Sequence, residues 1–325
     1  MSGPKIILGK TGLSVSRVAF GTWQLSPRFW GEVPTAQVGE AIRTAFDLGI
    51  NFFDTADAYG DGLAESVLGE ALQAFPRDRV IIATKVFNHY NPDGSRYPDL
   101  SPAHIRERCE ASLQRLRTDY LDLYLLHFYD QLTPLSLVAE TMEGLKAQGK
   151  IRHYGVSNFN IEELRAAVAA GNFAVLQPAY SLINLEAEQS LFPFCLAHDI
   201  GVMVYSPLHK GLLTGKYEGT ETFADFRKHH PDFQGERFRT IAQAVQGLAP
   251  LAGQYGMSIY QLVLAATLSH PAIHCAVIGV KNGNQVREAA GAVAKSIDRP
   301  DYFKVRQMLN FAAPAKIRDA GGKVK

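Results

Sequence analysis

The run Leu121-Asp122-Leu123-Tyr124-Leu125-Leu126 is apolar except for Asp122 and is the clearest strand signal in this chain. A continuous apolar run, without alternation of polar residues, is typical of a strand that is covered on both faces, as in a parallel sheet. Between residues 133 and 149 apolar side chains recur at helical spacing, after a Thr-Pro start signal and before a glycine stop signal. The two segments together predict a strand followed by a helix.

The same unit recurs along the whole chain. Seven further strands are predicted at residues 17–21, 51–53, 80–84, 153–156, 174–177, 201–205 and 275–278. Helices fit between them, and three have clear end signals: one from about Thr35 to Gly49, one capped by Ser101, and one from Asn160 to Gly171. Alternating strands and helices imply right-handed βαβ units in a parallel sheet.

Eight strand–helix pairs in 325 residues predict an α/β fold, a single closed (β/α)₈ TIM barrel spanning residues 1–325. Before the first strand, residues 5–8 and 14–16 flank Gly9-Lys10-Thr11-Gly12 and predict a β-hairpin. The one long connection, residues 208–235, follows the seventh strand. Long connections in compact domains are usually functional or disordered.

Composition excludes several classes of protein. The formal net charge is +1, with lysines and arginines scattered, so neither a nucleic acid nor a membrane surface is an expected partner. Three widely spaced cysteines argue against a disulfide framework and a structural zinc site. The chain opens without a signal-peptide pattern, and its apolar runs are too short to span a bilayer. We therefore expect a cytoplasmic protein, whose oligomeric state the sequence does not indicate.

The common nucleotide and metal motifs do not occur. No GxGxxG follows a strand, which argues against a Rossmann site. The segment from Gly211 to Tyr217 resembles a P-loop, but it has three residues between its glycines, and Tyr217 stands where a magnesium-binding Ser or Thr would be. No HxH or HExxH arrangement is present, so no metal is predicted.

The polar residues at the carboxyl ends of the strands suggest carbonyl chemistry, because active sites of β/α barrels lie at that end. Asp54, Tyr59, Lys85 and His127 follow the second, third and fourth strands. Hydride addition to a carbonyl builds negative charge on oxygen, and Tyr59 is a candidate proton donor there. An ammonium at Lys85, oriented by Asp54, would make Tyr59 a better acid, and His127 could hydrogen-bond the carbonyl oxygen.

Each of these residues also has an ordinary structural interpretation. Asp54 and Lys85 could be a structural ion pair, Tyr59 a half-buried aromatic residue, and His127 a residue that closes a strand. The convergence of four compatible groups on one face of one barrel favours the catalytic interpretation.

The motifs around these residues resemble those of the aldo-keto reductase family, in the branch of bacterial aldo/keto reductases and potassium-channel β-subunits. The resemblance is carried in order by Asp54-Thr55-Ala56-Asp57-Ala58-Tyr59-Gly60, Leu123-Tyr124-Leu125-Leu126-His127, Gly155-Val156-Ser157-Asn158-Phe159, Tyr205-Ser206-Pro207-Leu208 and the segment from Gly211 to Tyr217. It extends over nearly the whole chain. It implies NADPH as the cofactor and Asp54, Tyr59, Lys85 and His127 as the catalytic tetrad.

The resemblance also implies a cofactor site along the barrel mouth. Its residues would be Thr22, Trp23, Asp54, Ser157, Asn158, Gln177, Tyr205, Ser206, Pro207, Leu208, Gly211, Lys216, Arg227, Gly279, Lys281, Gln285 and Glu288. Ser157, Asn158 and Gln177 would hold the carboxamide, and Tyr205 would stack on the nicotinamide. Relatives usually have an asparagine where this chain has Ala289, which removes one adenine contact. The preference for NADPH over NADH then depends on Lys281, with Gln285.

The substrate would be a small carbonyl or alcohol, and the expected contacts are Trp23, Trp30, Tyr59, Phe87, His127 and Phe128. The aromatic residues suit an aromatic or aliphatic aldehyde, whereas His89, Asn91, Arg96 and Asp130 nearby would suit a sugar-like carbonyl. Two other functions remain open. One is an NADP(H)-binding regulatory subunit with slow chemistry, and the other is a barrel lyase that uses Lys85 as a Schiff base, which Asp54 disfavours.

Overall fold

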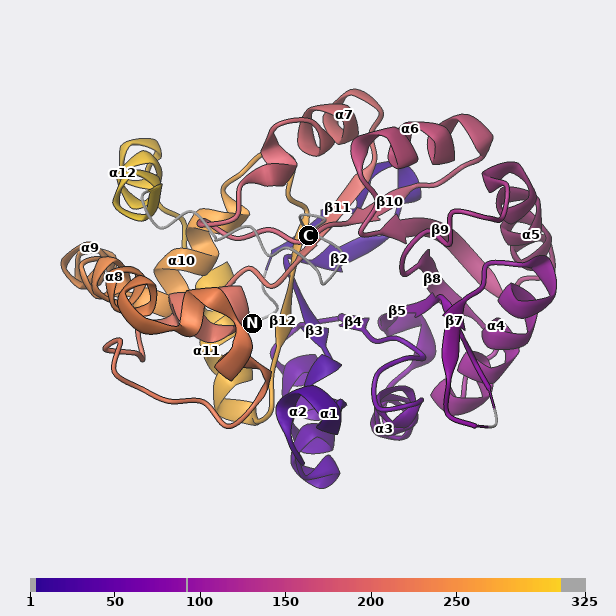
Figure 1. Ribbon diagram of the computed structural model, residues 1–325, viewed down its shortest axis with the longest axis horizontal. Helices are drawn as coiled ribbons and strands as arrows, with labels where there is room; N and C mark the ends of the chain where they lie inside the picture. The colour runs from indigo at the N-terminus through magenta and orange to yellow at the C-terminus, as the bar shows by residue number, and fades with distance from the viewer. Residues whose placement is uncertain (1–3, 92, 311–325) are drawn as a thin grey trace.

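The computed structural model describes residues 4–91 and 93–310 of the chain. Eight parallel strands form a closed barrel, in which each strand pairs with the next along the chain and the last pairs with the first (Figure 1). They are β3 (Val18–Gly21), β4 (Phe52–Asp54), β5 (Ile81–Val86), β8 (Leu121–Leu126), β9 (Ile151–Ser157), β10 (Val175–Gln177), β11 (Gly201–Tyr205) and β12 (Cys275–Gly279). This confirms the predicted (β/α)₈ barrel, and each predicted strand end lies within two residues of the observed one.

Helices surround the barrel and connect its strands. They are α2 (Thr35–Asp47), α3 (Leu63–Leu72), α4 (Pro102–Leu116), α5 (Leu135–Ala147), α6 (Ile161–Ala170), α7 (Leu191–Ala197), α10 (Ile259–Leu268) and α11 (Gly283–Val293). The predicted caps are present: Ser101 Oγ accepts from the backbone of His104, and Asn160 forms a capping box with Glu163. None of the helices in the described parts of the chain is both long and apolar enough to cross a membrane.

The interior of the barrel is filled by side chains and is closed at its amino end. Inward-facing residues such as Phe52, Leu123 and Met203 form one apolar cluster, which Leu8 and Val15 extend. Leu8 and Val15 belong to the predicted hairpin, β1 (Lys5–Ile7) and β2 (Ser14–Ser16), whose formation is thereby confirmed. Among the described residues, the hairpin therefore covers the barrel interior at the amino ends of its strands.

Two insertions enlarge that carboxyl end. A hairpin of β6 (Asn88–Tyr90) and β7 (Arg96–Pro98) follows β5, and the sequence pattern did not predict it because its strands are short and not apolar. The predicted long connection after β11 contains three short 3₁₀ turns, followed by α8 (Gly235–Gln246) and α9 (Ala249–Gln254). In Figure 1 these two helices lie to one side of the barrel with α12 (Arg299–Leu309), which packs against α8.

Candidate active site

Four polar side chains meet where β4, β5 and β8 end. Asp54 is the last residue of β4, Lys85 lies one residue before the end of β5, and His127 follows β8 directly. The Lys85 ammonium is fully buried and donates to both carboxylate oxygens of Asp54, at 2.9 and 3.0 Å. It also donates to the Thr55 carbonyl at 2.7 Å and to the Tyr59 hydroxyl at 3.3 Å. The structure therefore brings the predicted tetrad together and links its members by direct contacts.

Burial determines the protonation states of this group. Burial alone lowers the pKa of Lys85, but the Asp54 carboxylate and Tyr59 outweigh it and leave the pKa raised, so the ammonium is charged. Burial and the nearby ammonium lower the pKa of His127 to about 3, so its imidazole is neutral. The rings of Tyr59 and His127 lie edge to face, with their centroids 5.8 Å apart.

Two opposing effects set the acidity of Tyr59. Lys85 lowers the pKa of Tyr59, as predicted, but burial acts more strongly and the net pKa is raised. The reason is that a tyrosinate loses more by desolvation than it gains from an ammonium whose charge is already shared with Asp54. The predicted effect of Lys85 on Tyr59 therefore has the expected direction, and burial, which the sequence pattern did not weigh, raises the net pKa.

The ends of β9, β10 and β11 are joined to this group by amides and hydroxyls. Gln177 donates to Asp54 Oδ2 at 2.7 Å, and Ser157 Oγ donates to the Gln177 carbonyl at 2.9 Å. Asn158 has a left-handed backbone, with φ of 60°, and donates from its amide to the His127 carbonyl at 3.0 Å. Its amide oxygen accepts from the Tyr205 hydroxyl at 2.7 Å. The predicted carboxamide residues thus form one hydrogen-bonded rim beside the tetrad.

Positive charge gathers on the loops after β11 and β12. Arg227 donates to both carboxylate oxygens of Asp225, at 2.8 and 2.5 Å, and to the Tyr217 hydroxyl at 2.6 Å. The guanidinium of Arg227 and the ammonium of Lys281 both lie over the Trp30 ring, 5.5 and 5.4 Å from its centre. Burial lowers the pKa of Lys281, and the charges of Arg227 and Lys216 lower it further. These three cations are therefore close enough to repel one another.

Comparison with known proteins identifies the family to which this barrel and site belong. Residues 17–310 match the model of the Aldo/keto reductase family. The chain is 38% identical to the aldo-keto reductase YhdN of Bacillus subtilis over 306 residues, which cover 93% of this chain and 92% of that protein. The chain belongs to the aldo/keto reductase family. It is therefore an NAD(P)H-dependent oxidoreductase that acts on carbonyl groups, as predicted.

Two further relatives are useful in comparing function. The chain is 33% identical to the NADH-specific methylglyoxal reductase of Escherichia coli over 319 residues, which cover 94% of this chain and 98% of that protein. A solved aldo-keto reductase from Klebsiella pneumoniae in complex with NADPH has a TM-score of 0.73 and 29% identity, covering 98% of each chain.

The rim of this aldo/keto reductase fits a nicotinamide dinucleotide by its chemistry. The three clustered cations suit the phosphate groups of such a cofactor. Two buried polar atoms beside them, Trp30 Nε1 and Gln24 Oε1, have no hydrogen-bond partner among the described residues. A Cβ on Gly279 would lie 1.8 Å from Gln24 Nε2, so only glycine lets Gln24 approach the end of β12. Sequence reasoning missed Gln24, because a lone glutamine after a strand carries no motif.

The remaining residues predicted for the cofactor lie along the same rim. Thr22 donates from its backbone and its hydroxyl to the Asp54 carbonyl, and Trp23 packs against Trp30, Phe29 and Phe226. Pro207 and Leu208 are buried, Ser206 and Gly211 have left-handed φ values of 56° and 92°, and Lys216 lies over the Tyr217 ring.

The residues predicted for the adenosine end are held by protein groups. The side-chain oxygen of Gln285 accepts from the backbone of Lys281 at 2.7 Å, and the Glu288 carboxylate accepts from Ser258 Oγ at 2.9 Å. Both residues lie on α11, which Asn282 caps. The side chains of Gln285 and Glu288 are therefore held in defined positions by protein groups. A bound cofactor would have to join or replace these hydrogen bonds.

The residues predicted for the substrate fall into two groups. Phe87 packs against Phe128 with ring centres 5.2 Å apart, and Phe128 stacks on His127. Trp30 lies instead among the cations of the rim. Asp130, a candidate for binding sugar-like substrates, accepts four hydrogen bonds from Leu100, Leu132 and Thr133, so it holds the loop.

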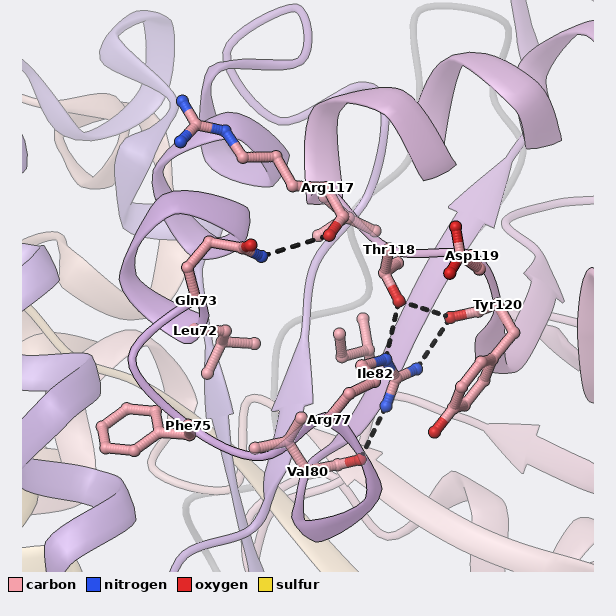
Figure 2. Close-up of a pocket in the computed structure, with 11 residues that line it drawn as sticks. Leu72, Gln73, Phe75, Arg77, Val80, Ile82, Arg117, Thr118, Asp119 and Tyr120 are labelled. Atoms are coloured by element: carbon pink, nitrogen blue, oxygen red, sulfur yellow. Dashed lines mark hydrogen bonds between the residues drawn. The ribbon is translucent and has the colours of Figure 1, made fainter.

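A separate pocket lies at the amino ends of β5 and β8, at the opposite end of the barrel from the tetrad. Figure 2 shows Arg77 extended across it. Arg77 donates to Thr118 Oγ1 at 2.7 Å and to the carbonyls of Val80 and Tyr120 at 2.9 and 2.7 Å. The guanidinium of Arg77 therefore ties these chain segments together, away from the tetrad.

Proposed function

We propose that this protein reduces an aldehyde or a ketone to an alcohol, with NADPH as the hydride donor and Tyr59 as the proton donor. The observation that carries the proposal is the buried Lys85 ammonium, which touches both the Asp54 carboxylate and the Tyr59 hydroxyl. A neutral His127 faces Tyr59 across the same space. NADPH, when bound, supplies the hydride for the carbonyl carbon.

Tyr59 delivers its hydroxyl proton to the substrate oxygen as negative charge develops there. The raised pKa of Tyr59 does not prevent this step, because an alkoxide is a much stronger base than a tyrosinate. The tyrosinate that remains is stabilised by Lys85 at 3.3 Å. Asp54 and the Thr55 carbonyl keep Lys85 charged and in place, and Tyr59 regains its proton from water after the product leaves.

His127 orients the substrate and does not act as the acid. A pKa of about 3 means that the imidazole carries a single N–H near neutral pH. That N–H can donate to the substrate oxygen from the side opposite Tyr59, which fixes the carbonyl and stabilises its developing charge. The division of roles follows from burial, since the same burial leaves Tyr59 protonated and His127 neutral.

The cofactor is proposed to extend from the tetrad to α11. Ser157, Asn158 and Gln177 would hold the carboxamide, and Tyr205 would stack on the nicotinamide ring. Lys216 and Arg227 would bind the pyrophosphate, and Lys281 with Gln285 would bind the 2′-phosphate. The preference for NADPH over NADH depends on the cation cluster, and relatives of both kinds occur: one is named NADH-specific and another was solved with NADPH.

The substrate is proposed to be a small carbonyl that lies between the tetrad and the pair Phe87 and Phe128, with Trp23 on its other side. Aromatic, aliphatic and sugar-like carbonyls all fit this description. Two relatives have names that point to small polar compounds. One is a solved glycerol dehydrogenase of Gluconobacter oxydans, with a TM-score of 0.88 and 30% identity, covering 98% of this chain and 99% of that chain. The other is the methylglyoxal reductase of Escherichia coli.

The test is NADPH oxidation with a panel of aldehydes and ketones, run on the parent and on Tyr59→Phe. Loss of turnover in the variant, with NADPH binding retained, supports the proposal, and equal turnover contradicts it. A parent that binds NADPH but reduces nothing would favour a regulatory role; one relative, from Arabidopsis thaliana, is named as a probable voltage-gated potassium channel subunit beta and is 30% identical over 299 residues. A Schiff-base lyase is disfavoured, because Lys85 is held charged by Asp54.

A further inference from the structure

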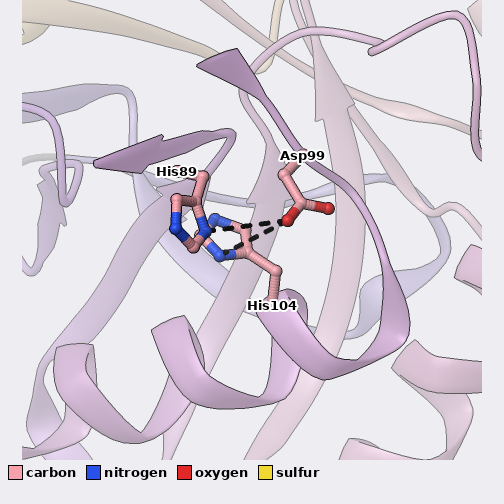
Figure 3. A group of neighbouring side chains, drawn as sticks. All are labelled: His89, Asp99 and His104. Carbon is pink, nitrogen blue, oxygen red and sulfur yellow. Dashed lines mark ion pairs between the residues drawn. The ribbon is translucent and has the colours of Figure 1, made fainter. Parts of the chain in front are cut away.

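A second group of chemically active side chains lies on the β6–β7 insertion. His89 comes from β6, Asp99 follows β7, and His104 lies in the first turn of α4 (Figure 3). His89 Nδ1 and His104 Nδ1 lie 3.8 and 3.9 Å from the same oxygen of Asp99, Oδ2. All three ligand atoms lie within 4.8 Å of one another. Two imidazoles and one carboxylate oxygen thus converge on one point.

His104 is the most informative member of this group. Its side chain is 4% exposed, and its Nε2 lies 3.1 Å from the Asn88 carbonyl. Because a carbonyl only accepts hydrogen bonds, Nε2 carries a hydrogen, and in the neutral imidazole this leaves a lone pair on Nδ1. That Nδ1 is buried and has no hydrogen-bond partner among the described residues. A cation between that lone pair and the carboxylate oxygen that it faces would satisfy both groups.

The surroundings match the shell that usually supports a metal ligand. Metal-binding histidines commonly donate their other N–H to a backbone carbonyl, as His104 does to Asn88. The remaining oxygen of Asp99, Oδ1, accepts from the Ser101 backbone at 2.7 Å, which orients the carboxylate. His89 is stacked on Tyr97, with ring centres 4.8 Å apart, and its side chain is 35% exposed. One side of the group is therefore open to water, as a fourth ligand requires.

The spacing is compatible with a small tetrahedral ion. Ligand atoms around tetrahedral zinc lie about 3.4 Å apart. The two histidine–aspartate separations of 3.8 and 3.9 Å exceed this value by less than 1 Å, and no two of the three ligand atoms are more than 4.8 Å apart. A small rotation of the partly exposed His89 and a shift of the Asp99 carboxylate would close the difference.

We propose that His89, Asp99 and His104 bind one divalent transition-metal ion, with zinc as the expected ion, and that this ion fastens the β6–β7 hairpin to α4. The ion completes its coordination with water. Its site is separate from the tetrad, and the proposed reduction does not use it. The backbone of Asp99 donates to the Phe87 carbonyl at 2.8 Å, so the ion also steadies the segment that carries Phe87.

A second group of two histidines and one aspartate among the described residues, His209, His230 and Asp232, does not support such a site. His209 Nε2 lies 2.8 Å from Asp232 Oδ2, and Arg237 is paired with Asp232 Oδ1. Both carboxylate oxygens thus already face donors, and the arginine charge opposes a metal ion there. This second group provides the matched control.

The experiment is a calorimetric titration of the full chain, freed of metal by a chelator, with zinc chloride. We expect about one equivalent to bind with micromolar or tighter affinity, and cobalt to give the visible spectrum of a tetrahedral site. Asp99→Asn, which keeps the shape of the side chain, and His89→Gln, which removes the imidazole, should each weaken binding by at least about 10-fold. His230→Gln should leave the titration unchanged.

Thermal unfolding supplies a second readout that does not depend on activity. Saturating zinc should raise the midpoint of the parent by about 2 °C or more, and the shift should disappear in His89→Gln. His89 is partly exposed, so this variant is expected to fold. Absence of binding by the parent, or equal binding by the parent, Asp99→Asn and His89→Gln, would overturn the proposal.

Discussion

The two halves of the barrel mouth are organised in different ways. The tetrad stands on or beside strand ends, and its charges already satisfy one another through the contacts of Lys85 with Asp54, Thr55 and Tyr59. The cationic half stands on loops, and Arg227 is held there by Asp225 and Tyr217. Groups on strands can be preorganised for a transition state, whereas groups on loops must exchange protein partners for a ligand. Changes in the first half should therefore affect turnover, and changes in the second should affect cofactor binding.

The largest effect is expected for Tyr59→Phe. Removing the hydroxyl removes the proposed acid but leaves the ring, so the turnover number should fall by about 100-fold or more. The dissociation constant of NADPH should change little. Steady-state kinetics measure the turnover number, and fluorescence titration measures the dissociation constant. A variant that loses NADPH binding but keeps its turnover number would contradict the assignment of turnover to the tetrad half.

Lys85→Met should affect stability as well as activity. It leaves the Asp54 carboxylate buried without its ion-pair partner, which typically costs about 3–5 kcal/mol in the free energy of unfolding. The double variant Asp54→Asn with Lys85→Met should recover part of that loss, because both charges are then removed. Urea unfolding checks this, and a double variant less stable than Lys85→Met alone would contradict the argument.

Acid pH should destabilise the tetrad half through His127. The folded pKa of about 3 lies below the ordinary value of 6.5, so the unfolded chain binds the proton more readily. Stability contributed by the neutral imidazole is complete above pH about 6.5 and is lost as the pH falls toward 3. Relative to His127→Gln, the parent should lose at most about 2 kcal/mol between pH 7 and pH 5. If the free energy of unfolding changed equally with pH in the two proteins over this range, His127 would not be held neutral.

The smallest effect is expected in the cationic half. Lys281→Ala should weaken NADPH binding by about 10-fold while NADH binding stays nearly constant, because only NADPH carries the 2′-phosphate. The turnover number should not change. Arg287→Gln, which removes an exposed positive charge from α11 outside the predicted cofactor site, is the control for a general disturbance of α11. Equal affinity of the unmodified protein for both cofactors would contradict the role of Lys281.

Local sequence patterns were sufficient to predict the barrel and the tetrad. Continuous apolar strands and capped helices are short-range features, and parallel strands bring their carboxyl ends to one rim. The same reasoning did not predict the β6–β7 hairpin, whose exposed strands have no apolar pattern. It also did not predict that Gln24 lies against Gly279 or that His89 lies beside His104, because those contacts depend on how loops fold over the barrel.

The amino-acid sequence by itself determined which chemical groups stand at the barrel mouth, since strand order and spacing place Asp54, Lys85 and His127 at neighbouring strand ends. Only the tertiary structure decided their protonation. Lys85 stays charged, His127 stays neutral and Tyr59 becomes less acidic, because desolvation depends on every element packed around each group. No local stretch of sequence contains that information.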